Sequence, residues 1–204
     1  MKDADGVRAA LEKIKQTFAE HLPGGKWAIH AGTALSAYYG RDNADGGVVL
    51  QGDNDLDFVV LAETCSPEDF TEAFLAAGWK KGYFFKDKVY PQIGVVLRFF
   101  WNGVPFDAYW LYLRGRKRWW LTAPRVPHVL PACLYENLDE AKVLGVSLPV
   151  PTPLEAYCYN KWARVGEKFP DNPRKGEMLC LQPEWQVYDD QVIHRERYEA
   201  EKRV

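Results

Sequence analysis

The sequence predicts an α+β protein in which a mixed β-sheet is packed with helices. Helix-like and strand-like segments alternate over residues 7–78, and strand-like segments rich in aromatic and β-branched residues then follow one another over residues 79–113. A further helix candidate comes at residues 153–165. The chain has 204 residues, of which 47% are hydrophobic, so it is long enough and apolar enough to bury a sizeable core.

The first part of the chain alternates between helical and extended segments. Apolar side chains at three- and four-residue steps predict the first helix. Ser66 and Pro67 mark the start of another, because serine caps a helix and proline fits its first turn. In order, the predicted elements are a helix at residues 7–21, a strand at 27–30, a helix from Gly32-Thr33 to Gly40, a polar loop at 41–52, a strand at 55–61 and a helix at 67–77.

The second part changes to the periodicity of strands. Asn102-Gly103 separates two apolar runs and predicts a hairpin. The remaining expectations are a turn or loop at residues 114–120, an irregular excursion with short strands at 124–153, a helix at 153–165 and a solvated helix at 188–204.

Charge and cysteine usage exclude several classes of protein. The formal net charge is −2, so no global charge steers the chain to nucleic acid or to a membrane surface. No stretch approaches the roughly 20 apolar residues of a transmembrane helix, and the charged, amphipathic N-terminus is not a signal peptide. The four cysteines are scattered without metal-ligand spacing, which favours reduced thiols and a cytoplasmic protein.

An acidic stretch, GDNDLDFVV at residues 52–60, leads into the strand predicted at 55–61. Asp53, Asp55 and Asp57 occupy alternate positions, so in an extended chain their carboxylates point to one face and repel one another. A divalent cation relieves that repulsion, and Mg²⁺ (or Mn²⁺) prefers such oxygen ligands. We therefore predict a metal site at Asp55 and Asp57, with Asp53 either a further ligand or a cap at the strand start.

A third carboxylate comes from a later strand. Asp107 lies in the otherwise apolar stretch VPFDAY, where an unpaired aspartate would cost several kcal/mol to bury. That cost argues for a partner, and we expect Asp107 to complete the metal site. Arg98, in the stretch GVVLRFFW, is expected either to lie beside Asp107 and bind a phosphate with two hydrogen bonds, or to face solvent.

The Gly32-Thr33 pair lies between a predicted strand and a predicted helix. Glycine lets the backbone approach a ligand closely, and the N-terminus of a helix offers unpaired N–H groups to a phosphate. Because the acidic strand follows, we expect this pair to hold a phosphate beside the metal. His30, just before it, is expected to be structural.

These motifs resemble the LicD/fukutin branch of the nucleotidyltransferase superfamily. GTALS at residues 32–36 is similar to the branch's G-T-L-L-G helix start, and GDNDLDF at 52–58 to its W-D-D-D-I-D-I strand. LGVSLPVP at 144–151 and the later Lys161-Trp162 are similar to its downstream features. The resemblance covers residues 27–170.

The resemblance implies an organisation and an activity. It implies a nucleotidyltransferase-like catalytic core over residues 1–120, with a C-terminal extension, residues 121–204, packed on it. The implied activity moves a phospho-substituent, such as phosphocholine or a phospho-alditol, from a CDP-type donor to a glycan or other hydroxyl acceptor, as in the modification of cell-surface glycans. Lys161 would contact the donor's phosphates and Trp162 its base or sugar; alternatively, Trp162 lies in the core and Lys161 outside.

The three aspartates would have different roles in that activity. Asp55 and Asp57 would hold Mg²⁺ against the pyrophosphate, and Asp107 would bind a second ion or take the proton of the acceptor hydroxyl. Gly32 and Thr33 would hold a phosphate of the nucleotide-linked donor. These are the roles that charge neutralisation and in-line alignment require in phosphoryl transfer.

The chain departs from the branch in places expected to read the substrate. Gly52 and Asn54 stand where the branch has Trp and Asp, and the loop at 41–52 lacks its Arg-His-Gly-Gly run. RGRKR at residues 114–118 is either a solvated turn or a contact surface for a polyanionic acceptor.

Two other functions share parts of this evidence. A nucleotidyltransferase that moves NMP from an NTP to a small molecule or a protein would use the same Gly-Thr pair and aspartates. A non-catalytic metal-binding module is the other, because DNDLD at residues 53–57 begins like an EF-hand calcium loop. Phe58 and Thr64 stand where that loop requires glycine and glutamate, which disfavours the module.

Overall fold

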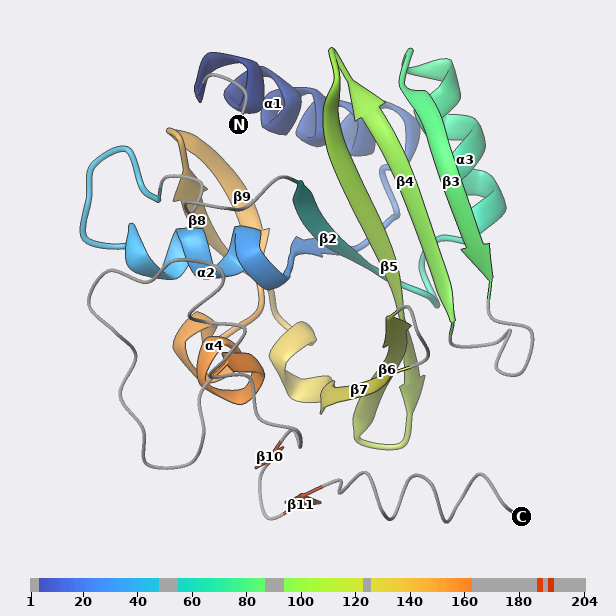
Figure 1. Ribbon diagram of the computed structural model, residues 1–204. Helices are drawn as coiled ribbons and strands as arrows, with labels where there is room; N and C mark the ends of the chain where they lie inside the picture. The colour runs from blue at the N-terminus through green and yellow to red at the C-terminus, as the bar shows by residue number, and fades with distance from the viewer. Residues whose placement is uncertain are drawn as a thin grey trace.

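The computed structural model describes residues 4–47, 55–86, 94–122, 126–162, 187–188 and 191–192. It confirms the predicted α+β class, with a mixed sheet packed with helices (Figure 1). In chain order the elements are α1 Ala4–His21, β1 Trp27–Ile29, α2 Ala31–Tyr39, β2 Leu56–Leu61, α3 Pro67–Ala76, β3 Lys80–Lys86, β4 Val95–Trp101, β5 Val104–Arg114, β6 Lys117–Thr122, β7 Val126–Pro131, the 3₁₀ helix η1 Ala132–Tyr135, β8 Asp139–Val143, β9 Val146–Val150, α4 Leu154–Trp162, β10 Val187–Tyr188 and β11 Gln191–Val192.

Seven strands form the main sheet. Five of them follow the order β1-β2-β5-β4-β3, and the long strand β5 also pairs with β6, which pairs in turn with β7. β2 and β5 run parallel, whereas the other neighbouring pairs of this sheet are antiparallel. The β8–β9 hairpin is a separate two-stranded sheet. The parallel pair at the centre sets residues of β2 directly beside residues of β5.

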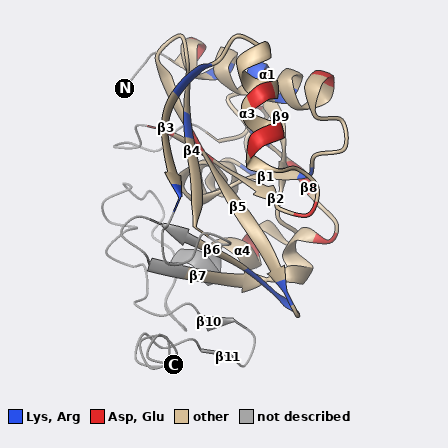
Figure 2. Ribbon diagram, turned by 90° about the vertical axis from the view of Figure 1, so that its right-hand side faces the viewer, with Lys and Arg blue, Asp and Glu red and all other residues tan. Residues whose placement is uncertain are grey.

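Helices α1 and α3 cover one face of the sheet, behind it in Figure 1 and on the same side in Figure 2. Phe106 of β5 stacks on Phe74 of α3, with ring centroids 5.3 Å apart, and meets Phe58 of β2 edge-on at 5.0 Å. Phe18 of α1 and Phe70 of α3 extend this cluster. Because aromatic rings bury large apolar areas, this face supplies much of the core.

The opposite face of the same strands carries polar side chains, because successive residues of a strand point to opposite sides. Asp57 and Asp107 are partners in the parallel β2–β5 ladder. Arg98 of β4 is the antiparallel partner of Asp107. One row across three strands therefore holds two carboxylates and a guanidinium.

The loop after α2 is held against the β8–β9 hairpin at Gly47. The Gly47 N–H donates to the Lys142 carbonyl at 2.9 Å, and the Leu144 N–H donates to the Gly47 carbonyl at 2.8 Å. A Cβ on Gly47 would lie 1.8 Å from the carbonyl oxygen of Ser36 in α2, so only glycine fits there. This close approach fixes α2 in place.

The structure corrects the sequence prediction in two places. Residues 117–120, expected in a turn or loop, belong to β6, where Trp119 pairs with Val129 of β7. Aromatic and β-branched residues in such cross-strand pairs favour a strand. Within the helix predicted at 188–204, the described residues Tyr188 and Gln191–Val192 instead form the short β10–β11 pair. The short strands expected within 124–153 are present as β7, β8 and β9.

Among the described residues, no helix has both the length and the apolar character needed to span a bilayer.

Candidate active site

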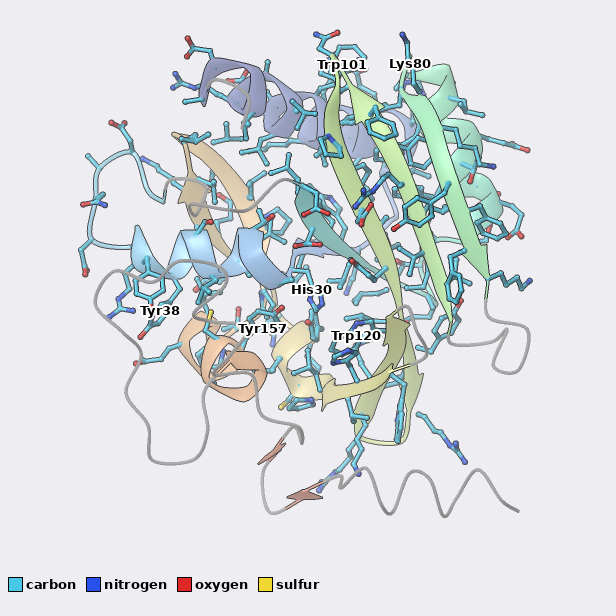
Figure 3. All side chains as sticks on the ribbon, in the orientation of Figure 1. His30, Tyr38, Lys80, Trp101, Trp120 and Tyr157 are labelled. Atoms are coloured by element: carbon cyan, nitrogen blue, oxygen red, sulfur yellow. The ribbon has the colours of Figure 1, made fainter. Side chains whose placement is uncertain are left out.

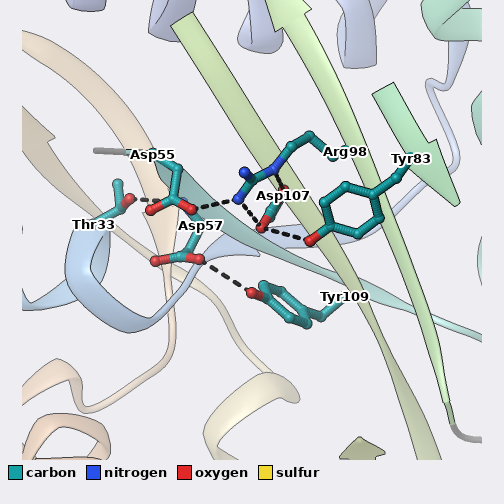
Figure 4. Close-up of polar contacts among 7 residues, drawn as sticks. All are labelled: Thr33, Asp55, Asp57, Tyr83, Arg98, Asp107 and Tyr109. Carbon is teal, nitrogen blue, oxygen red and sulfur yellow. Dashed lines mark hydrogen bonds and ion pairs between the residues drawn. The ribbon is translucent and has the colours of Figure 1, made fainter. Parts of the chain in front are cut away.

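Three carboxylates meet at the polar face of the sheet, as the sequence predicts (Figure 4). One oxygen each from Asp55, Asp57 and Asp107 can be chosen so that all three lie within 4.8 Å of one another. Asp55 precedes β2, Asp57 lies in it and Asp107 lies beside Asp57 on β5. Asp57 and Asp107 are only 5% and 3% exposed, so water screens their charges poorly.

Two hydrogen bonds connect the start of α2 to the backbone of Asp57. The His30 N–H donates to the Asp57 carbonyl at 2.8 Å, and the Asp57 N–H donates to the Thr33 hydroxyl at 2.9 Å. No described residue accepts a hydrogen bond from the N–H of Gly32 or Thr33. These two donors therefore point from a helix N-terminus beside the carboxylates, which suits an anion.

Tyr157 of α4 holds this helix start from the other side. Its hydroxyl accepts a hydrogen bond from the Ala31 N–H at 2.9 Å and is also hydrogen-bonded to His30 Nδ1 at 2.7 Å. Ala31 has a φ of 42°, a left-handed conformation that costs energy in a residue with a Cβ. The Tyr157 hydroxyl thus supports a strained turn at the entrance to α2.

His30 is buried in an aromatic environment, in agreement with its predicted structural role. It is 1% exposed, and its ring lies against Trp120 edge-on, with centroids 5.0 Å apart, and against Tyr109 at 5.6 Å. Figure 3 shows His30 between Tyr157 and Trp120. Its contribution is to fix the position of the helix start.

Arg98 lies beside Asp107 on the same face, and its guanidinium is bound by carboxylates. Arg98 Nε and Nη2 each donate to one oxygen of Asp107 at 2.6 Å, and Nη2 also donates to Asp55 Oδ2 at 2.6 Å. The hydrogen bonds to Asp107 raise the pKa of Arg98, so it stays charged. Burial raises the pKa of Asp107, and Arg98 offsets this only in part. Phosphate binding by Arg98 stays a prediction.

Two tyrosines complete the site, and the sequence analysis missed both. The Tyr109 hydroxyl lies 3.4 Å from Asp57 Oδ1, and the Tyr83 hydroxyl lies 3.5 Å from Asp107 Oδ2. Strand alternation gave a signal for Tyr109, which lies two residues after Asp107 and therefore on its face. Tyr83 had no such signal, because the β3–β4 register shifts between Lys81 and Phe84.

Other predicted residues are not placed in the site. Asp53 lies outside the described residues, and so do the side chains of Lys161 and Trp162, although both belong to α4. Their roles stay predictions.

The basic stretch at 114–118 contains both exposed and buried residues, and its contact with an acceptor stays a prediction. The β5–β6 hairpin tip carries basic residues (Figure 2), but Arg118 is only 5% exposed. Its Nη1 and Nη2 donate to the two carboxylate oxygens of Glu63 at 3.0 and 2.6 Å. Arg118 is therefore a structural residue.

The donor set fits a hard divalent cation. Three carboxylates supply only oxygen ligands, which Mg²⁺ and Mn²⁺ prefer, and Arg98 binds two of the three. Within the described parts of the chain, no other group of three histidine, cysteine, aspartate or glutamate ligands lies close enough together to hold a metal.

No protein-family model and no curated protein sequence matches the chain. Among solved structures, the chain is similar to the crystal structure of ANT(2")-Ia in complex with adenylyl-2"-tobramycin, with a TM-score of 0.47 and 12% sequence identity. The alignment covers 71% of this chain and 68% of that one. A likeness of this strength does not indicate a shared activity.

Proposed function

We propose that this chain is a metal-dependent nucleotidyltransferase, which moves a nucleoside monophosphate from a nucleoside triphosphate to a hydroxyl group of a small molecule or protein. The observation that carries the proposal is the cluster of Asp55, Asp57 and Asp107 beside the N–H groups of Gly32 and Thr33, which donate to no described residue. A cluster of carboxylates for a cation next to N–H donors for an anion suits a metal-bound polyphosphate.

The chain's residues take separate roles in this reaction. Asp55 and Asp57 would hold Mg²⁺ or Mn²⁺, which neutralises the phosphate charge when bound. Gly32 and Thr33 would donate their N–H groups to a phosphate of the donor and orient it. The acceptor oxygen bonds to the α-phosphorus as the bond to pyrophosphate breaks, and Asp107 accepts the proton of the hydroxyl. Burial raises the pKa of Asp107, which suits it as a base.

A second candidate is transfer of a phospho-substituent from a CDP-type donor to a glycan hydroxyl. GTALS at 32–36 and GDNDLDF at 52–58 support it through their similarity to the LicD/fukutin branch. Gly52 and Asn54, which differ from that branch, weigh against it. We therefore place it second.

The identity of the leaving group distinguishes the two reactions. A thermal-shift panel of NTPs and CDP-linked compounds with Mg²⁺ or Mn²⁺ would first identify the donor, because a ligand of the folded state raises its stability. Labelled donor would then be incubated with candidate hydroxyl acceptors. Release of pyrophosphate from an NTP supports the proposal, and release of CMP from a CDP-linked donor supports the second candidate. Metal binding without nucleotide binding would contradict both and favour a binding module.

A further inference from the structure

Arg98 occupies oxygens of the carboxylate cluster that a metal ion would also need. Arg98 binds Asp107 with two hydrogen bonds and Asp55 with a third, each 2.6 Å long. Asp57 is the third carboxylate of the same cluster. Arg98 therefore bridges the oxygens that would bind a metal ion, and the two cations compete for them.

The Arg98 guanidinium is partly open to solvent. Its side chain is 27% exposed, and its guanidinium lies 5.2 Å from the ring centroid of Tyr83 on β3 (Figure 4). Gly82 lets β3 pack closely against the base of this side chain, because a Cβ there would lie 3.1 Å from Arg98 Cγ and 2.7 Å from the Phe100 ring. The exposed side therefore gives the guanidinium a way out of the cluster, by rotation of the outer side-chain torsions and without a change in the strands.

We propose that Arg98 and a divalent cation alternate in this site. In the metal-free chain the guanidinium bridges Asp55 and Asp107. Metal binding displaces it from the carboxylates toward solvent, where the Arg98 guanidinium can meet a phosphate group of the donor. This inference rests on the proposed function, because it describes how the metal and the donor would enter that site.

Two physical consequences follow from the exchange. A metal ion must replace three short hydrogen bonds, so its affinity for the unliganded chain is lower than three carboxylates alone would give. A bound triphosphate offers the displaced guanidinium a new planar, two-bond partner. Metal and triphosphate therefore strengthen each other's binding, with a coupling in the 5–150-fold range typical of linked sites.

Calorimetric titration with Mn²⁺ tests the exchange in Arg98→Met, with Arg118→Met as the matched control. Both changes remove one arginine that binds a carboxylate with two hydrogen bonds, but only Arg98 touches the cluster. We expect Arg98→Met to bind Mn²⁺ about tenfold or more tightly than wild type, and Arg118→Met to bind it as wild type does. In Arg98→Met, the coupling to a nonhydrolysable NTP should fall. Equal Mn²⁺ affinity in the two variants would overturn the proposal, as would a failure of both wild type and Arg98→Met to bind Mn²⁺.

A measurement on the wild-type chain covers the case in which Arg98→Met does not fold. Phenylglyoxal labels accessible guanidinium groups, and peptide mass spectrometry locates the label. Saturating Mn²⁺ should speed the labelling of Arg98 severalfold and leave Arg118 unchanged. Unchanged labelling of Arg98 with Mn²⁺ bound would show that the guanidinium stays in place, and would overturn the exchange.

The outcomes also separate this inference from the transferase proposal. If Mn²⁺ releases Arg98 but no nucleotide is transferred to any acceptor, the exchange stands and the proposed function fails. If nucleotide is transferred while Arg98 labelling does not respond to Mn²⁺, the proposed function stands and the exchange fails.

Discussion

Arg98 and Arg118 each bind one carboxylate with two hydrogen bonds, but through different nitrogens and in different electrostatic surroundings. Each forms two hydrogen bonds to one carboxylate, Arg98 to Asp107 and Arg118 to Glu63. The Arg118 pair is balanced, with one charge of each sign. Arg98 lies in a cluster of three carboxylates, Asp55, Asp57 and Asp107, and binds two of them.

This difference is why we propose a chemical role for the first region and a structural role for the second. The Arg118 pair matches one charge with another, although Arg118 Nε has no hydrogen-bond partner among the described residues. Three carboxylates with oxygens within 4.8 Å of one another repel each other, and a bound cation relieves that repulsion. The opposite face of the same strands packs in the hydrophobic core. This packing stabilises the strands and offsets the repulsion among the carboxylates.

The largest effect is expected from Asp57→Asn and Asp55→Asn. Each removes a metal ligand, so metal-dependent transfer should fall by about 10³-fold or more, beyond the loss typical of an outer-shell residue. The variants should remain folded, because an amide replaces one of three mutually repelling charges. Transfer rates and circular dichroism check this, with Glu63→Gln as a control that keeps activity. Near wild-type transfer in either aspartate variant would contradict the proposed role of these aspartates as metal ligands.

Removal of one partner at the balanced pair is expected to affect stability instead. Glu63→Ala leaves the guanidinium of Arg118, which is 5% exposed, without its acceptor, and should cost about 2–3 kcal/mol of unfolding free energy. Arg118→Met should cost less, because the Glu63 side chain is 43% exposed and water can solvate it. Urea unfolding measures both. Equal costs would mean that burial does not distinguish the two partners.

Two buried tyrosines allow the same comparison between a partnered and an unpartnered group. Tyr157→Phe removes the acceptor of the Ala31 N–H and should cost about 1–2 kcal/mol and weaken triphosphate binding. Tyr135→Phe is the matched control, because the Tyr135 hydroxyl has no hydrogen-bond partner among the described residues. Tyr135→Phe should leave the free energy of unfolding unchanged or raise it. Thermal unfolding and a triphosphate titration measure both, and equal losses in the two variants would deny Tyr157 its positioning role.

The smallest effect is the acid dependence of the Glu63–Arg118 pair. Burial raises the pKa of Glu63, but hydrogen bonding and the charge of Arg118 outweigh it and lower the pKa below its usual value. The pair therefore stabilises the fold above the unfolded pKa of about 4.3, and this contribution disappears as the pH falls through the lowered folded pKa. Because Glu63 is partly exposed, we expect less than about 1 kcal/mol. Urea unfolding of wild type and Glu63→Gln should converge between pH 5 and pH 3; a constant difference would contradict this.

The aspartates of the site were predictable because strand alternation is a local property. Asp55 and Asp57 share a face through their spacing, and Asp107 was conspicuous in an apolar strand. The sequence did not reveal that β2 pairs with β5 in the register that sets Asp57 against Asp107. A slip of one residue would have turned Asp107 to the opposite face.

The partners of these aspartates depend on contacts between distant segments. Arg98 was expected beside Asp107, but its bond to Asp55 requires three strands in one particular order. Tyr157 reaches Ala31 across 126 residues, and no spacing rule relates two positions so far apart. The strands and helices of the first 113 residues were foreseen more closely, since periodicity and capping residues are local signals.

The long-range hydrogen bond between Ala31 and Tyr157 also has a consequence for folding during synthesis. Contacts between residues far apart in the chain close late, because a long loop must be ordered before they can form. While the chain is synthesised, strands β1 to β7 can pair before α4 exists, but the entrance to α2 then lacks its hydroxyl support. If the start of α2 binds phosphate as proposed, a chain that has not yet been made past residue 157 would bind nucleotide more weakly than the finished protein.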